Sequence, residues 1–118
     1  MEIFEEFYNT QVKLIQKTKL TPKVLDTFRR VVIIYIAEFV ATTNELLKLS
    51  ENLLHYEFIR EARLSHHFKH NGVYHEGQIR EIGNTLDYSI IYLKNDIEYC
   101  ESKLLHYKKL ITLITKYL

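Results

Sequence analysis

One repeat in the middle of the sequence restricts what the chain can fold into. Mostly apolar residues recur at alternating steps of three and four over more than four heptads, at Leu25, Phe28, Val32, Tyr35, Phe39, Thr42, Leu46, Leu49, Leu53 and Tyr56. A helix with this period presents one continuous stripe, along which another helix can pack at a shallow angle. The repeat therefore predicts a long helix with coiled-coil-like packing.

The limits of this helix are marked by residues with strong positional preferences. Thr21 is a good N-cap, and Pro22 suits the first helical position. The pair Asn71-Gly72 supplies residues that commonly end helices, whereas Ser50 can cap a new start midway. The sequence thus predicts either one helix from Pro22 to the region of Asn71, or two helices that meet near Ser50.

Two further segments have helical periodicity. The first, residues 2–18, has Phe4, Phe7, Leu14 and Ile15 on one face. The second carries a long stripe at Ile79, Ile82, Leu86, Ile90, Leu93, Ile97, Cys100, Leu104, Tyr107, Ile111, Ile114 and Leu118. No segment alternates as a β-strand does. We expect an all-α fold in a single domain over residues 1–118, an antiparallel helical bundle of three or four helices. Two of these helices are long and are joined near residues 71–77.

Some apolar residues lie off the stripe of the middle helix and need additional cover. They are Val31, Ile33, Ile34, Ile36 and Val40. One helical partner cannot cover them together with the stripe, so we expect cover from the helix at residues 2–18 and from a second copy of the chain. The sequence therefore predicts a homodimer.

The composition of the sequence restricts the cellular compartment and the class of partner that we expect for this protein. With 16 basic and 15 acidic residues the net charge is +1, which creates no field that attracts nucleic acid or an anionic membrane. The most apolar run, residues 31–41, is far shorter than the ~20 residues of a membrane span, and Glu38 interrupts it. The single Cys100 excludes an internal disulfide, and the first ten residues lack the features of a secretory signal. These features favour a cytoplasmic protein that is not embedded in a membrane.

Basic side chains continue the repeat of the middle helix beyond Tyr56. The next positions of the stripe are Arg60, Arg63, His67 and His70. These side chains are expected to face the returning helix, where a buried charge is costly unless it is paired. We expect Glu81 or Asp87 to supply the opposite charge.

Arg60 is followed by His66 and His67 on the same predicted helix. This spacing of arginine and histidine resembles the signature of HEPN-domain ribonucleases. Members of that family are small α-helical dimers of toxin–antitoxin and phage-defence systems. The resemblance implies metal-independent cleavage of RNA. In such a site His66 or His67 would move the proton of the attacking 2′-hydroxyl, and Arg60 or Arg63 would steady the phosphate. Glu61 stands where the family has a small polar residue.

Two other interpretations of the same cluster need no RNA. Basic residues near the carboxyl end of a helix complement its dipole and can be purely structural. His66 and His70 are one turn apart, and His75 and Glu76 could complete a zinc site. Pairs of histidines at this spacing are common, however, and are a weak signal for a metal site. The sequence also contains no glycine-rich loop of the kind that binds the phosphates of a nucleotide. We therefore predict no metal and no cofactor.

Three tyrosines of the last helix, Tyr88, Tyr92 and Tyr99, share a face beside its stripe. They could pack against the first helix, anchor a protein interface or stack on bases. A protein interface requires no catalytic motif. The sequence thus favours a non-enzymatic, homodimeric interaction module, an inhibitor, adaptor or regulator that binds a protein partner through these tyrosines. The HEPN-like ribonuclease is the alternative.

Overall fold

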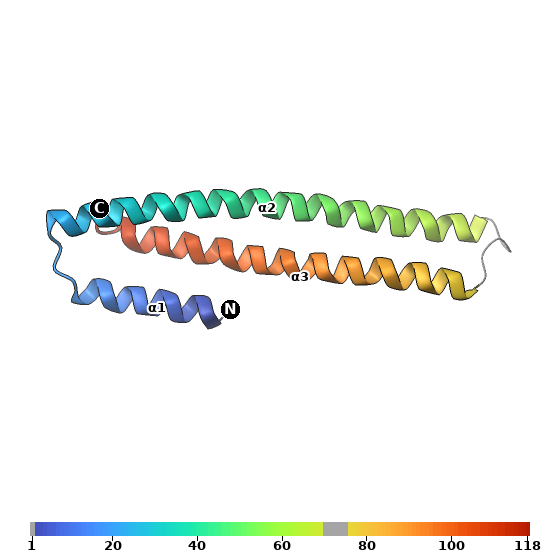
Figure 1. Ribbon diagram of the computed structural model, residues 1–118, viewed down its shortest axis with the longest axis horizontal. Helices are drawn as coiled ribbons and strands as arrows, with labels where there is room; N and C mark the ends of the chain where they lie inside the picture. Colours follow the sequence, from blue (N-terminus) through green and yellow to red (C-terminus); the bar gives the residue numbers. More distant parts are fainter. Residues whose placement is uncertain (1, 70–75) are drawn as a thin grey trace. The chain divides into compact units, whose positions relative to one another are not determined.

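The computed structural model describes the backbone of residues 2–69 and 76–118 and the side chains of residues 2–63 and 86–118. These residues form three helices, α1 (Glu2–Lys17), α2 (Pro22–Lys69) and α3 (Glu76–Thr115), and no strand (Figure 1). The predicted all-α fold is confirmed. α2 continues through Ser50 without a break. The predicted connection at residues 71–77 lies largely outside the described residues.

The polar residues between α1 and α2 fix the helix ends. Thr18 closes α1, because its backbone N–H donates to the Ile15 carbonyl oxygen at 3.2 Å. Thr21 opens α2, since its Oγ1 accepts the backbone N–H of Val24 at 3.2 Å and its carbonyl oxygen accepts that of Leu25 at 3.0 Å. This is the arrangement of an N-cap, and it confirms the predicted start of the helix.

The chain divides into two compact units, each of which contains parts of α2 and α3. Unit 1 consists of Met1–Glu45 and Tyr99–Leu118, and unit 2 consists of Leu46–Glu98. Unit 1 therefore contains all of α1 with the first part of α2 and the last part of α3. Unit 2 contains an antiparallel pair formed by the rest of α2 and α3.

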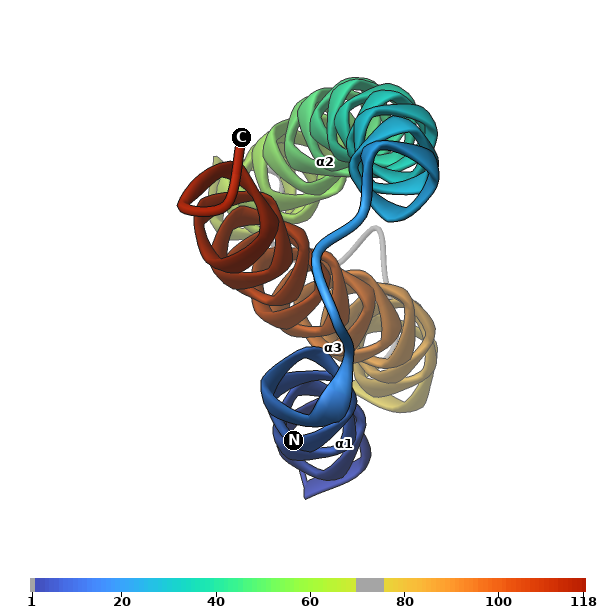
Figure 2. The ribbon, with the colours of Figure 1, turned by 90° about the vertical axis from the view of Figure 1, so that its left-hand side faces the viewer.

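All three helices contribute to the core of unit 1, in which α3 lies between α1 and α2 (Figure 2). Ile15 of α1, Val32 of α2, and Leu113 and Ile114 of α3 form one buried cluster. Half-buried apolar residues pack around it, namely Tyr8, Val12, Phe28, Val31 and Tyr35. Leu113 lies outside the predicted stripe of α3, so contact with α1 buries a second face of this helix.

The predicted stripes form the interface between α2 and α3. In unit 2, Leu86 and Ile90 of α3 are buried. The facing positions of α2 are half-buried, at Leu46, Leu49, Leu53 and Tyr56. In unit 1, Thr42 and Cys100, both members of the predicted stripes, are each 2% exposed. The coiled-coil-like packing predicted from the repeat is thereby confirmed within each unit.

Candidate functional site

Arg60 of α2 is paired with Asp87 of α3 within unit 2. The Arg60 Nε donates a hydrogen bond to Asp87 Oδ1 at 2.6 Å, and Arg60 Nη1 lies 3.6 Å from Glu61 Oε1. An acid of the returning helix was expected opposite the basic continuation of the repeat, and Asp87 confirms this expectation. Arg60 is therefore held in an ion pair between the two helices of unit 2.

The other members of the predicted catalytic cluster are less closely placed. The Arg63 side chain is exposed, less than one turn beyond Arg60. His66 and His67 belong to α2, but their side chains lie outside the described residues. The predicted convergence of Arg60, Arg63, His66 and His67 on one cleft therefore stays a prediction.

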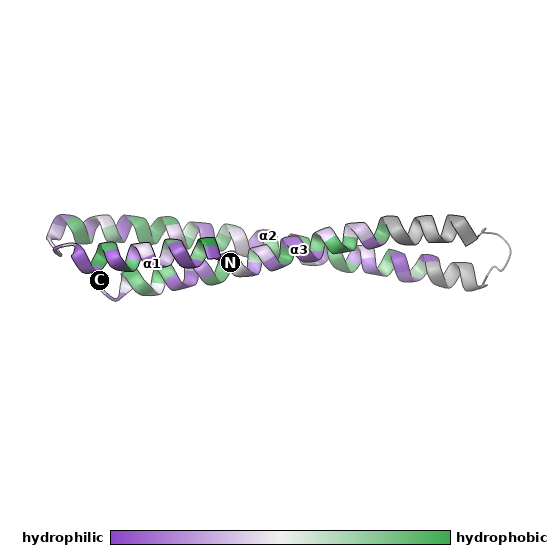
Figure 3. Cartoon of the chain, turned by 90° about the horizontal axis from the view of Figure 1, so that it is seen from below, coloured by the Kyte–Doolittle hydropathy of each residue, from purple (hydrophilic) through white to green (hydrophobic). Residues whose placement is uncertain are grey.

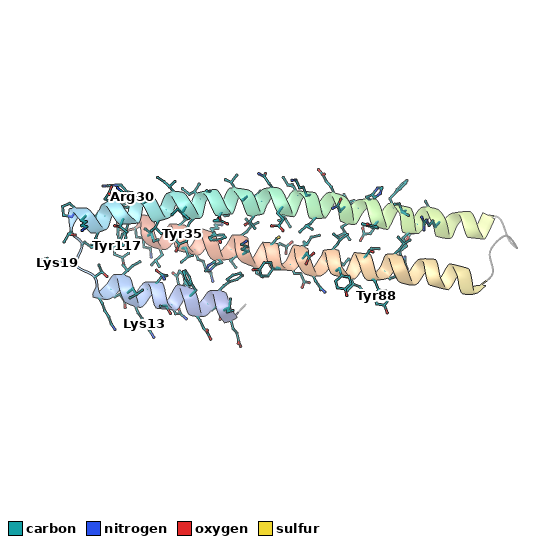
Figure 4. All side chains as sticks on the ribbon, viewed as in Figure 1. Lys13, Lys19, Arg30, Tyr35, Tyr88 and Tyr117 are labelled. Atoms are coloured by element: carbon teal, nitrogen blue, oxygen red, sulfur yellow. The ribbon has the colours of Figure 1, made fainter. Side chains whose placement is uncertain are left out.

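The three predicted interface tyrosines differ in their surroundings. Tyr99 lies against α1, with its ring centroid 6.0 Å from that of Phe4. Tyr88 and Tyr92 are 65% and 69% exposed, and the neighbouring Ile91 is 53% exposed. Tyr88 is on the side of α3 that is turned away from α2 (Figure 4). We call Tyr88, Ile91 and Tyr92 the tyrosine surface.

His106 continues the same face of α3 and was not singled out from the sequence. Its ring stacks on Phe4 at a centroid distance of 4.5 Å and meets Phe7 edge-on at 5.5 Å. Burial lowers the pKa of His106 below its ordinary value of 6.5. The signal was present in the sequence, since steps of three and four lead from Tyr92 through Tyr99 to His106.

A shallow groove of about 320 Å³ lies beside His106, between α1 and α3. It is lined by Phe4, Glu5, Tyr8, Asn9, Ser102, Leu105, His106 and Lys109. A nucleophilic site requires a hydrogen-bonded chain of nucleophile, base and orienting acid. Among the described side chains, no hydrogen bond or ion pair joins Ser102, His106 and Glu5.

The outward side of α2 in unit 1 carries a second apolar surface. Ile33, Ile34, Ile36 and Val40 are 66%, 58%, 46% and 52% exposed. Val31, by contrast, packs against the core cluster. We call the four exposed residues the apolar face of α2. In the hydropathy view of Figure 3, green bands alternate with purple ones along the first part of this helix. The chain itself thus covers only one of the five residues for which additional cover was predicted.

The described side chains contain no cluster of the size that binds a metal ion. No group of three or more potential ligands among His, Cys, Asp and Glu occurs there, and the candidate ligands His66, His70, His75 and Glu76 lie outside the described side chains. None of the described helices has a stretch apolar enough to cross a membrane.

Comparison of the chain with protein families, curated proteins and solved structures found no match.

Proposed function

We propose that this protein is a non-enzymatic helical module that binds another protein through its tyrosine surface and acts as a homodimer. The observation that carries the proposal is the exposure of Tyr88 and Tyr92, at 65% and 69%, on consecutive turns of α3. Tyrosine combines a large apolar ring with a hydroxyl, and for this reason it is enriched at the centres of protein interfaces.

The neighbouring contacts support a surface that is ready to bind. Asp87, beside Tyr88 in sequence, is tied to Arg60 of α2 at 2.6 Å, so the part of α3 that carries the tyrosines is held to the other helix of unit 2. A fixed backbone reduces the conformational entropy that binding must overcome. The partner should offer an apolar pocket edged by a hydrogen-bond acceptor for a phenolic hydroxyl.

Affinity capture from the native host with three forms of the protein tests this proposal. The forms are the unaltered chain, the double variant Tyr88→Ala/Tyr92→Ala, and the control Leu54→Ala, which removes a side chain that is 68% exposed on α2 of the same unit. We expect one protein to be retained by the unaltered chain and by Leu54→Ala, and to be lost with the double variant. Equal capture by all three forms would refute the role of the tyrosine surface.

The second candidate function is metal-independent cleavage of RNA. The exposure of Arg63, on the same helix as His66 and His67, supports it. The test is cleavage of labelled single-stranded RNA in excess EDTA, with Arg63→Ala, His66→Ala and His67→Ala beside the unaltered protein. Cutting that disappears with Arg63→Ala and with either histidine variant would establish this function. Intact RNA with a folded protein would exclude it.

A further inference from the structure

The apolar face of α2 is unusual because it is wide and almost free of charge. Ile33, Ile34, Ile36 and Val40 are all about half exposed or more, at 46–66%. Between residues 31 and 41 the single charged residue is Glu38. A surface helix usually places polar residues on the side opposite the core, so an apolar outer side indicates a covering partner.

Within unit 1, α1 does not cover this face. The ring contacts of α1 join Phe4 and Phe7 to Tyr99 and His106 of α3. Arg30, at the beginning of the face, is on the side of α2 that is turned away from α3 (Figure 4). The face therefore remains open after the three helices of unit 1 have packed together.

Charges of opposite sign lie at the two ends of this face. Arg30 precedes it and Glu45 follows it, both in unit 1. The two positions are about four turns apart, so their side chains project to the same flank of α2. The midpoint between them falls at Ala37 and Glu38, which is also the centre of the apolar segment.

The apolar face with Arg30 at one end and Glu45 at the other is complementary to a second copy of the same helix that runs in the opposite direction. If a second α2 packs antiparallel across a two-fold axis near Ala37, then Arg30 of each copy lies beside Glu45 of the other, and the apolar residues face each other. The present partner of Arg30 is Asp26, one turn away at 3.2 Å, and the two side chains are 78% and 55% exposed. Such an exposed pair within one helix is weak enough to be rearranged.

We propose that the apolar face of α2 is the homodimer interface, in which two copies pack antiparallel and Arg30 of each copy pairs with Glu45 of the other. This inference rests on the homodimer of the proposed function and assigns it a surface and a register. A second copy fits better than an unrelated helix, because Arg30 and Glu45 become opposite each other when the same helix is reversed. Glu38 lies near the axis beside its own copy, which weakens the dimer.

The charge pairs can be tested with two variants, Arg30→Glu and Glu45→Arg. Alone, each variant places like charges together at both ends of the interface, and we expect its self-association to weaken about 5- to 30-fold. When the two variants are mixed, every pair is again of opposite sign. The mixture should therefore form mainly heterodimers, which native mass spectrometry distinguishes from homodimers by mass. A statistical mixture, or a monomer of the unaltered chain at all concentrations in analytical ultracentrifugation, would overturn the proposal.

Two more variants separate this surface from the tyrosine surface. Ile34→Asp introduces a charge on the apolar face at an exposed position, so it should leave the helical circular dichroism unchanged and abolish the dimer. Tyr88→Ala/Tyr92→Ala should dimerise like the unaltered chain, whatever its effect on the binding of another protein. If dimerisation survives Ile34→Asp, or is lost with the tyrosine variant, the interface lies elsewhere. Loss of partner capture without loss of dimerisation concerns only the proposed function.

Discussion

The Arg60 Nε lies 2.6 Å from Asp87 Oδ1, and this hydrogen-bonded ion pair joins α2 to α3 in unit 2. It stands where the apolar repeat of α2 gives way to basic residues. The side chains are 35% and 46% exposed, so water screens their attraction. The pair thus fixes the lateral position of the two helices more than it stabilises them.

The first prediction concerns the strength of this pair. A double-mutant cycle with Arg60→Ala and Asp87→Ala should give a coupling free energy of about 0.5–1 kcal/mol, measured by urea unfolding. Glu61 provides the control, because it is 3.6 Å from Arg60 and its side chain is 74% exposed. A cycle of Arg60→Ala with Glu61→Ala should show no measurable coupling. A larger coupling to Glu61 than to Asp87 would contradict the geometry.

The second prediction compares two leucines of α3 in unit 1. Leu110 is 0% exposed and Leu105 is 53% exposed. Leu110→Ala should lower the free energy of unfolding by about 2–4 kcal/mol, because it removes buried methyl groups and leaves a cavity. Leu105→Ala should change it by less than about 0.5 kcal/mol. Chemical denaturation of both variants measures these two changes. Equal losses of unfolding free energy would mean that Leu105 is covered in solution.

The third prediction concerns the N-cap of α2. Thr21→Ala removes the acceptor of the Val24 N–H, a hydrogen bond of 3.2 Å, and should cost about 1 kcal/mol of unfolding free energy. Thr21→Ser keeps a hydroxyl in the same position and should retain most of this stability. If the serine variant is as unstable as the alanine variant, the hydroxyl is not the stabilising group.

The fourth prediction is a pH dependence that comes from His106. Its pKa in the folded chain lies below the ordinary value of 6.5, because burial beside Phe4 and Phe7 disfavours the charged ring. As the pH falls below 6.5, the unfolded chain takes up the proton more readily than the folded chain, so stability decreases. Above this value the contribution is fully present.

The measurement is the free energy of unfolding at pH 5 to 8, compared between the unaltered protein and His106→Leu. The variant lacks the part of the acid dependence that His106 causes, so the unaltered protein should lose more unfolding free energy than the variant as the pH is lowered. An NMR titration should place the pKa of His106 below 6.5 directly. A pKa above that value would show that the aromatic rings stabilise the charged form instead.

Much of the packing between α2 and α3 could be predicted from the sequence, because a repeat of three and four has only one regular way to be buried. Thr21 and Pro22 located the start of α2, and the stripe included Val32, Thr42 and Cys100, which are buried. Leu118 also belongs to the repeat, but α3 ends at Thr115 and Leu118 is 49% exposed. Periodicity gives the direction of a side chain and not the length of the helix.

The position of α1 could not be derived in this way. Tyr92 and Tyr99 are the same residue type on the same face of α3, yet Tyr99 touches Phe4 and Tyr92 is 69% exposed. The difference depends on where the short helix α1 packs, and tertiary contacts decide this.

The repeat places Arg60 on the stripe of α2, and Asp87 is one of the acids that the sequence offers as its partner on the returning helix. The histidines that would make Arg60 catalytic lie outside the described side chains.

Because Cys100 is buried, its reaction with a thiol reagent can be used to measure local opening of the helical bundle. This thiol is the single one in the sequence, and it is 2% exposed in unit 1. A thiol reagent can reach it only when that part of the bundle opens, so the rate of modification measures the opening equilibrium in the intact protein. If this part of the bundle opens only in the monomer, the dimer that we propose should slow the reaction progressively as the concentration of protein is raised. No label has to be introduced.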